Sequence, residues 1–447
     1  MSSESDRLDR VDDLVARAMA AGADAADAIY VEGTSLSMAC RKGQPEMLTR
    51  SEGYDLGLRV FIGNRQAMVS SSDFSKSALS ELVERAVAMA RVVPEDPYCG
   101  LAPSELLATD IPDLDGCDPV EPDGPELERR AAVAEDAARS IAGVTNSEGA
   151  EAGWGCSYVA LAGSNGFSAT RAGSSHSLSV SVLAGEGTEM ERDYDFAVAV
   201  HGEDLADPAE LGKSAGEKAV RRLNPQKAET AQVPVIYDPR VSSSLLRHLA
   251  SAINGVSVAR GTTFLKDKMG DQLFPEAITV VDDPLRQRGL GSKPFDAEGV
   301  ATARRNVIEN GVLQTWILDL RSARQLDLQT TGHASRGTSS APSPSITNFY
   351  LAAGDVSPEE LIGGIDQGFY VTELIGMGVN GVTGDYSRGA GGFWIENGEL
   401  GYAVSEMTIA GNLKDIFMNM TAADDLEFKF GTNAPTVRVD GLTVAGK

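Results

Sequence analysis

One short segment, LLRHLASAIN (residues 245–254), combines a histidine with the spacing of an amphipathic helix. Its apolar residues recur at steps that place them on one helical face: Leu245, Leu246, Leu249 and Ile253. Arg247 and His248 fall beside or opposite that stripe. Many zinc peptidases hold their metal through histidines on such a helix. The segment therefore raises the question of a metal site.

The spacing of the histidines and cysteines alone does not indicate a metal site. The four histidines are isolated (His176, His201, His248 and His333), and the four cysteines form no closely spaced pair (Cys40, Cys99, Cys117 and Cys156). A site built from His248, His333 and carboxylates such as Asp282 and Asp283 is an alternative. A catalytic zinc needs about three protein ligands, and nothing in the spacing selects that set.

Two other motifs match chemical signatures only by letters. GMGVNG (residues 376–381) fits G-x-G-x-x-G, but the following VTGDYSRGAGG is rich in glycine and is not expected to form the helix that a dinucleotide site requires. Gly212-Lys213-Ser214 resembles the end of a phosphate loop but lies inside a predicted helix. No G-x-S-x-G elbow is present, so an α/β-hydrolase triad has no anchor.

Charge and composition limit the function classes. The chain has 447 residues with 39 basic and 65 acidic side chains, a net charge of −26. Nucleic-acid backbones require clustered Lys and Arg, so direct DNA or RNA binding is not expected. The sequence shows no secretory signal and no apolar run long enough to span a membrane. We expect a cytoplasmic protein with reduced thiols.

The first half of the chain predicts an α+β domain over residues 1–226. Helical spacing covers residues 1–22 and 77–92, with strands between them over residues 28–71. Residues 54–62 alternate as in a half-buried strand, and Gly63-Asn64 supplies a hairpin turn. A helix over residues 125–143 precedes a second group of strands, which ends near Val200 and includes SLSVSVLA. Asp207 is expected to cap a further helix. The polar segment at residues 224–232 marks the boundary of the domain.

The second half, residues 233–447, predicts a β-rich domain that opens with the helix containing His248. VIENGVLQTWILD (residues 307–319) and WIENGELGYAVSE (residues 394–406) each place Asn-Gly between apolar runs. Asn-Gly is the strongest short hairpin signal, because both residues tolerate positive φ. Two similar hairpins are expected, with turns at Asn310-Gly311 and Asn397-Gly398.

Several longer blocks of this second half resemble the PmbA/TldD family in order and spacing. They are residues 289–311 (GLGSKPFDAEGVATARRNVIENG), 331–337 (TGHASRG), 378–400 (GVNGVTGDYSRGAGGFWIENGEL), 405–417 (SEMTIAGNLKDIF) and 437–446 (VRVDGLTVAG). With the helix at Leu245, the resemblance covers nearly all of residues 233–447. The family comprises bacterial and archaeal zinc metallopeptidases that work as pairs of related subunits.

The resemblance implies that this chain lacks the family's metal site. In a TldD-like subunit, two histidines of an HExxxH helix and a later cysteine hold zinc, and the glutamate is the general base. On those positions this chain has Arg247, His248 and Ala252, and no cysteine follows Thr421. Arginine stays protonated and alanine has no lone pair, so neither can bind zinc. The resemblance therefore implies that this chain binds no metal and that a TldD-like partner binds zinc.

By resemblance, the expected role is that of a non-catalytic, TldE/PmbA-like subunit of a heteromeric zinc peptidase. Its partner would be a TldD-like subunit, and the family's substrates are unfolded peptides, leader peptides and antitoxins. Asp385, Ser387 and Arg388, in the glycine-rich stretch TGDYSRGAGG (residues 383–392), are candidates for lining the substrate cavity. An ordinary surface loop with an Asp–Arg pair is an equal alternative reading of that stretch.

Two other functions stay open. The chain could be a metallopeptidase by itself, as a homodimer with other ligands. It could also be a non-proteolytic regulatory protein of the gyrase-modulator type. For a chain that pairs with a relative, an exposed apolar patch is expected on the second domain.

Overall fold

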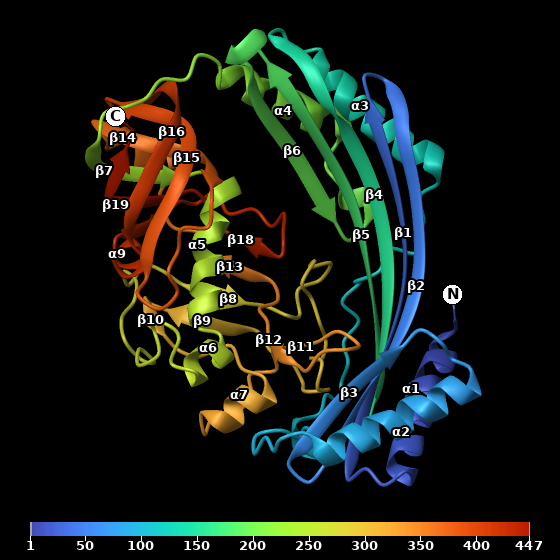
Figure 1. Cartoon of the computed structure of the whole chain (residues 1–447). Helices are drawn as coiled ribbons and strands as arrows, with labels where there is room; N and C mark the ends of the chain where they lie inside the picture. Colours follow the sequence, from blue (N-terminus) through green and yellow to red (C-terminus); the bar gives the residue numbers. More distant parts are fainter. Residues whose placement is uncertain (1, 447) are drawn as a thin grey trace.

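The computed structural model describes residues 2–446, and the first half of the chain forms one long antiparallel sheet (Figure 1). The strand order is β3-β2-β1-β4-β5-β6, and each neighbouring pair is antiparallel. The strands are β1 (Ala25–Arg41), β2 (Gln44–Ile62), β3 (Arg65–Ser71), β4 (Val144–Gly163), β5 (Ser168–Ala184) and β6 (Glu191–Ala199).

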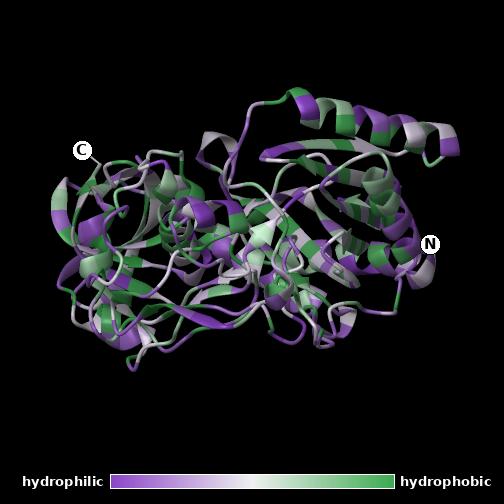
Figure 2. Cartoon of the chain, turned by 90° about the horizontal axis from the view of Figure 1, so that it is seen from below, coloured by the Kyte–Doolittle hydropathy of each residue, from purple (hydrophilic) through white to green (hydrophobic). Residues whose placement is uncertain are grey.

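Four helices cover one face of this sheet: α1 (Glu4–Ala20), α2 (Lys76–Val92), α3 (Gly124–Arg139) and α4 (Pro208–Arg221). The helices α1 and α2 pack on one end of the face, around Tyr30 and Leu58. The helices α3 and α4 pack on the other end, around Met38 and Trp154. Hydrophilic and hydrophobic residues alternate along the helices near the N-terminus, as expected for helices with one buried side (Figure 2).

The opposite face of the sheet, called the inner wall below, is made mainly of small residues. Cross-strand partners point to the same side of a sheet, and the pairings align Gly33, Ser35, Gly155, Ser157, Gly173, Ser175, Ser177 and Ser179. At one end of this face, Ile29 and Leu161 pack against Phe295 of the second half of the chain. The inner wall is therefore covered at one end by the second half.

The prediction of a half-buried strand at residues 54–62 was wrong in one respect. Residues 56–61 of β2 are buried on both faces, because the second half of the chain packs on the inner one. A Cβ on Gly57 would lie 2.1 Å from the carbonyl oxygen of Thr338. Arg59 is buried and donates from Nε and Nη2 to Asp27. Alternation within one strand could not reveal this tertiary contact.

The second half of the chain contains two larger sheets. One has the order β10-β9-β8-β13-β18, and the other has the order β16-β15-β14-β7-β19-β17, with an additional pairing of β16 with β19 that partly closes it. The strands of the first are β8 (Val280–Asp282), β9 (Arg305–Glu309), β10 (Val312–Leu313), β13 (Phe349–Leu351) and β18 (Thr432–Asn433). Those of the second are β7 (Ala231–Tyr237), β14 (Gln367–Ile375), β15 (Asp385–Glu396), β16 (Glu399–Asn412), β17 (Met420–Ala422) and β19 (Val437–Ala445).

Short elements connect and cover these sheets. The helices are α5 (Pro239–Ala252), α6 (Gly255–Ala259), α7 (Leu320–Gln325), α8 (Pro358–Gly363) and α9 (Leu413–Met418), and β11 (Ala334–Ser335) pairs with β12 (Ser343–Pro344). The α+β class is confirmed, with a β-rich second half. Within residues 2–446, no helix has the length and apolarity to cross a membrane.

The three predicted hairpins are confirmed: β2–β3, β9–β10 and β15–β16. In the two Asn-Gly turns, Asn310 and Asn397 have φ of 49° and 50°, and each following glycine has φ of 79°. Local turn chemistry therefore determines these connections, whatever the surrounding packing.

The reading of residues 383–392 as a loop was wrong, because β15 begins at Asp385. The glycines there allow close packing: a Cβ on Gly392 would lie 1.9 Å from the carbonyl oxygen of Tyr370. The preceding GMGVNG segment follows β14 and leads into a strand. A dinucleotide site needs a helix at that place, so the match by letters fails in the structure as predicted.

Candidate functional site

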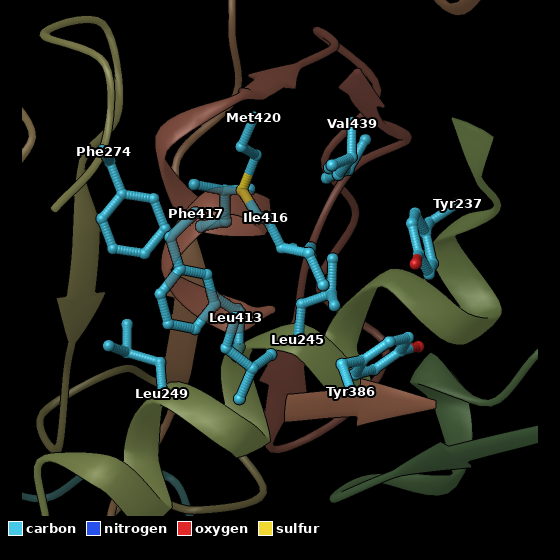
Figure 3. Packing of buried hydrophobic residues seen from close by; sticks show 14 of the residues in the cluster. Tyr237, Leu245, Leu249, Phe274, Tyr386, Leu413, Ile416, Phe417, Met420 and Val439 are labelled. Atoms are coloured by element: carbon cyan, nitrogen blue, oxygen red, sulfur yellow. The ribbon is translucent and has the colours of Figure 1, made fainter. Parts of the chain in front are cut away.

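The helix α5 forms where the sequence analysis expected it. Asp238 caps it by accepting a hydrogen bond from the Arg240 backbone N–H, and Pro239 occupies the first turn. Its apolar face is fully buried through Leu245, Leu246 and Leu249. Figure 3 shows Leu245 and Leu249 directed toward a cluster that includes Leu413 and Phe417 of α9. Hydrophobic packing therefore accounts for the stability of this helix without a bound metal.

The side chains at the degenerate metal positions do not form a donor set for zinc. Arg247 is exposed and donates from Nη2 to Ser243 Oγ at 3.1 Å. Ala252 is buried, with 4% of its surface exposed, and has no donor atom. All four cysteines lie at or before Cys156 in the sequence, so none follows β17. Only His248 has a lone pair to offer, and one ligand does not hold zinc.

His248 lies in an environment that keeps it neutral. Burial lowers its pKa to about 4, and the charges of Arg388 and Arg247 add to the effect. Its Nε2 is buried and has no hydrogen-bond partner within the described chain. Its ring lies edge-on to the ring of Tyr386, with 6.0 Å between centroids. The contact of this half-buried imidazole with Tyr386 is a packing contact.

The three residues proposed for the substrate cavity all lie on β15, and they do not act together. Asp385 accepts from Thr383 Oγ1 at 2.6 Å and from Asn412 Nδ2 at 3.1 Å, and these bonds lower its pKa. Arg388 donates from Nε to the carbonyl oxygen of Ile375 at 3.3 Å, and Ser387 is exposed. Residues three apart in a strand point to opposite faces, so the alternative Asp–Arg pair does not form.

The alternative metal set does not assemble either. His333 Nε2 lies 3.0 Å from Asp282 Oδ1, and Thr347 occupies the rest of that carboxylate. His248 lies elsewhere, beside β15. Within residues 2–446, no three His, Cys, Asp or Glu side chains are grouped so that they could hold a metal ion. His333 is therefore a buried partner of Asp282.

A cavity of about 1120 Å³ lies against the inner wall. The other sides are formed by residues 111–117 and by part of the segment 289–294. The lining of this cavity includes Gly33, Ser35, Gly155, Ser157 and Gly173 from the sheet. Asp385, Ser387 and Arg388 are not part of that lining. Their contact with substrate stays a prediction.

Two thiols meet in the wall of this cavity. Cys117 Sγ and Cys156 Sγ lie 3.4 Å apart, and both line the cavity. The hydrogen bond from Cys117 lowers the pKa of Cys156 to about 6, while the same contact raises the pKa of Cys117. The sequence analysis missed this pair, because the two residues are far apart in the chain. The alternation of SLSVSVLA was the only sequence signal of a polar wall.

Comparisons with known proteins agree with this architecture. Three models of the PmbA/TldA metallopeptidase family match: domain 1 at residues 26–90, the central domain at residues 118–223 and the C-terminal domain at residues 230–446. The Metalloprotease PmbA of Escherichia coli O157:H7 is 39% identical, over 95% of this chain and 93% of its own length.

Solved structures show the same fold. A Bacteroides thetaiotaomicron protein, described as a candidate modulator of DNA gyrase, has a TM-score of 0.90 with 26% identity and covers 98% of both chains. TldE from Thermococcus kodakarensis has a TM-score of 0.84 with 21% identity, over 97% of this chain and 99% of its own. The fold, the three family domains and the identity to PmbA together make this chain a member of the PmbA/TldD family.

Proposed function

We propose that this chain is a non-catalytic, TldE-like subunit of a heteromeric zinc metallopeptidase that acts on unfolded peptides and leader peptides. The observation that carries the proposal is the donor set of α5. Arg247 and Ala252 stand at two positions where the active subunit needs imidazoles, and neither has a lone pair for zinc. In such a pair, zinc and the general base belong to the partner.

The inner wall supports a role in holding peptide. Its serines and glycines present small polar groups to a cavity of about 1120 Å³. A lining of small side chains favours main-chain contacts over pockets for particular side chains, as a peptidase of broad specificity requires. In this proposal the chain forms one side of the chamber in which the partner's zinc cleaves.

The second half of the chain offers a surface for the partner. The end of β14 and the segment between β14 and β15 expose three apolar side chains: Ile375, Met377 (91% exposed) and Val382. Apolar side chains grouped on one exposed segment are a common mark of an interaction site. This segment is our candidate for part of the interface with a TldD-like subunit.

The test is cleavage of an unstructured peptide by the TldD-like subunit from the same cell, by this chain, and by both together. The proposal predicts no cleavage by this chain, and a change in the rate or substrate range of the partner when this chain is added. An unchanged partner would contradict the subunit role. Zinc-dependent cleavage by this chain alone would favour the homodimeric peptidase.

A variant sharpens the interface part of that test. Met377→Asp places a charge in the exposed apolar segment and should weaken co-elution with the partner by at least about tenfold, because a buried unpaired charge is costly in an interface. Met190→Asp is the matched control, since Met190 is also exposed but lies before β6 of the first sheet. Equal co-elution of both variants would rule out the segment as an interface.

A further inference from the structure

A small buried chamber adjoins the large cavity where the inner wall meets the second half of the chain. Its volume is about 20 Å³, which at about 10–15 Å³ for each water-sized group is room for one to two oxygen atoms. Arg171 of β5 lines both the chamber and the large cavity. Lys293 and Arg336, from the second half of the chain, also line the chamber. Three cationic residues and one acidic residue, Asp296, therefore line one small space.

Two of these cations make no direct ion pair. Within residues 2–446, neither the guanidinium of Arg171 nor the ammonium of Lys293 makes an ion pair or a side-chain hydrogen bond. Burial lowers the pKa of both groups, and Arg171 lowers that of Lys293 further, which the charges of Asp282 and Asp296 offset only in part. Both residues are half-buried, and cations withdrawn from water without a direct ion pair are rare, because desolvation makes them costly. Their presence beside a cavity suggests that an anion compensates them.

The third cation, Arg336, presents an unused pair of donors. Its Nη1 donates to Asp27 Oδ1 at 2.7 Å, while its Nε and Nη2 are buried and have no partner. In the neighbouring Arg59, the same two donors, Nε and Nη2, both bind the Asp27 carboxylate. The same edge of Arg336 matches the two oxygens of a planar carboxylate.

The nearby acidic side chains are already engaged. Asp27 is shared between Arg59 and Arg336. Asp296 accepts from the backbone N–H groups of Glu298, Val300 and Ala334. Burial raises the pKa of Glu298 to about 8, so this side chain is mostly neutral at pH 7. The cluster therefore has more cations than anions, although the whole chain has a net charge of −26.

We propose that Arg171, Lys293 and Arg336 bind one carboxylate group, which enters the small chamber from the large cavity. The group is the end or an acidic side chain of a peptide lying along the inner wall. The carboxylate site rests on these three residues alone. Its peptide source rests on the proposed function.

The experiment measures the thermal unfolding midpoint in chloride-poor buffer at constant ionic strength, with a bulky sulfonate as the balancing salt. Acetate probes the site itself. An unstructured peptide with a free carboxyl end, and the same peptide amidated and without acidic residues, probe the source. We expect the midpoint to rise with acetate and with the free acid, and not with the amide.

Arg171→Gln is the decisive variant. Since Arg171 makes no ion pair, the variant should fold and be at least as stable as the wild type without acetate. Its affinity for acetate, obtained from the rise of the unfolding midpoint with acetate concentration, should be at least about tenfold weaker. The variant loses one charge-assisted hydrogen bond to the carboxylate. Arg192→Gln is the control, because Arg192 lies on the same sheet but pairs with Glu148 at an exposed position. It should respond as the wild type does.

Three outcomes decide the proposal. An absent response in the wild type, or an equal response in Arg171→Gln, overturns the carboxylate site. A response to acetate with no difference between the acid and amide peptides supports the site and overturns its peptide source. A response that follows both the carboxyl group and Arg171 supports the whole proposal. The cleavage assay with the partner fails or succeeds independently of these results.

Discussion

The helix α5 and the inner wall are the two regions where function could lie, and they are built in opposite ways. The helix buries Leu245, Leu246 and Leu249 in a dense core, but its polar positions cannot hold a metal. The inner wall buries little, yet its serines and Arg171 line a cavity. The helix is held by packing, whereas a wall of small residues contributes little packing and leaves space for a ligand.

The largest effect on stability should come from a substitution in the buried face of α5. Leu249→Ala removes a side chain that is 0% exposed in the core of the second half, and it should lower the free energy of unfolding by about 3 kcal/mol. Denaturant unfolding measures this loss. Ser251→Ala, an exposed change on the same helix, is the control and should have little effect. A cost below about 1 kcal/mol for Leu249→Ala would mean that α5 is not retained for packing.

The junction between the two regions predicts a pH effect. Burial raises the pKa of Glu298 from its ordinary 4.5 to about 8, so the folded chain binds an extra proton between these values. Stability from this group is complete below pH 4.5 and is lost as pH rises to about 8. In Glu298→Gln that loss should disappear. The difference between variant and wild type should reach at most about 1.4 kcal/mol per pH unit in this window, measured by denaturant unfolding.

Since Gln keeps an acceptor for the Leu320 backbone N–H, the variant should fold. Parallel stability–pH curves of the variant and the wild type between pH 4.5 and 8 would contradict a raised pKa at Glu298.

A smaller pH effect should come from the imidazole on α5. The pKa of His248 is lowered to about 4 by burial and then by Arg388 and Arg247. The unfolded chain therefore binds the extra proton between about pH 6.5 and 4, and stability falls as pH drops through this range. His248→Gln should reduce that fall by less than about 1 kcal/mol, because the ring is partly screened by solvent.

Proton NMR of the imidazole measures the pKa of His248 directly. A titration midpoint near 6.5 would show that His248 is solvated. It would contradict the description of α5 as a helix whose polar face is also packed.

The smallest effect should come from the inner wall. Ser179 is exposed on β5, and Ser179→Ala should change the free energy of unfolding by no more than about 0.5 kcal/mol. Thermal or denaturant unfolding measures it. A loss above about 1 kcal/mol would show that the serines of the wall hold the fold, and the contrast with α5 would weaken.

Sequence patterns predicted the parts of this fold that depend on near neighbours. The helices follow from periodicity and caps, as at Asp207, and the hairpins follow from Asn-Gly turns. The burial of Arg59 could not be predicted, because it depends on Glu298 and Asp27, which are distant in the chain.

The candidate site divides in the same way. The degenerate helix was visible because its residues are consecutive. The chamber of Arg171, Lys293 and Arg336 was not, since three separate segments meet there only after the sheet packs on the second half. The strand β15 was misread as a loop, because glycines needed for close packing resemble glycines needed for flexibility.

The most direct test of the central claim is the zinc content of the purified chain, measured by inductively coupled plasma mass spectrometry in the absence of any partner. The account predicts far less than one zinc per chain, and no difference between the wild type and His248→Ala. One tightly held zinc per chain that is lost in His248→Ala would contradict it.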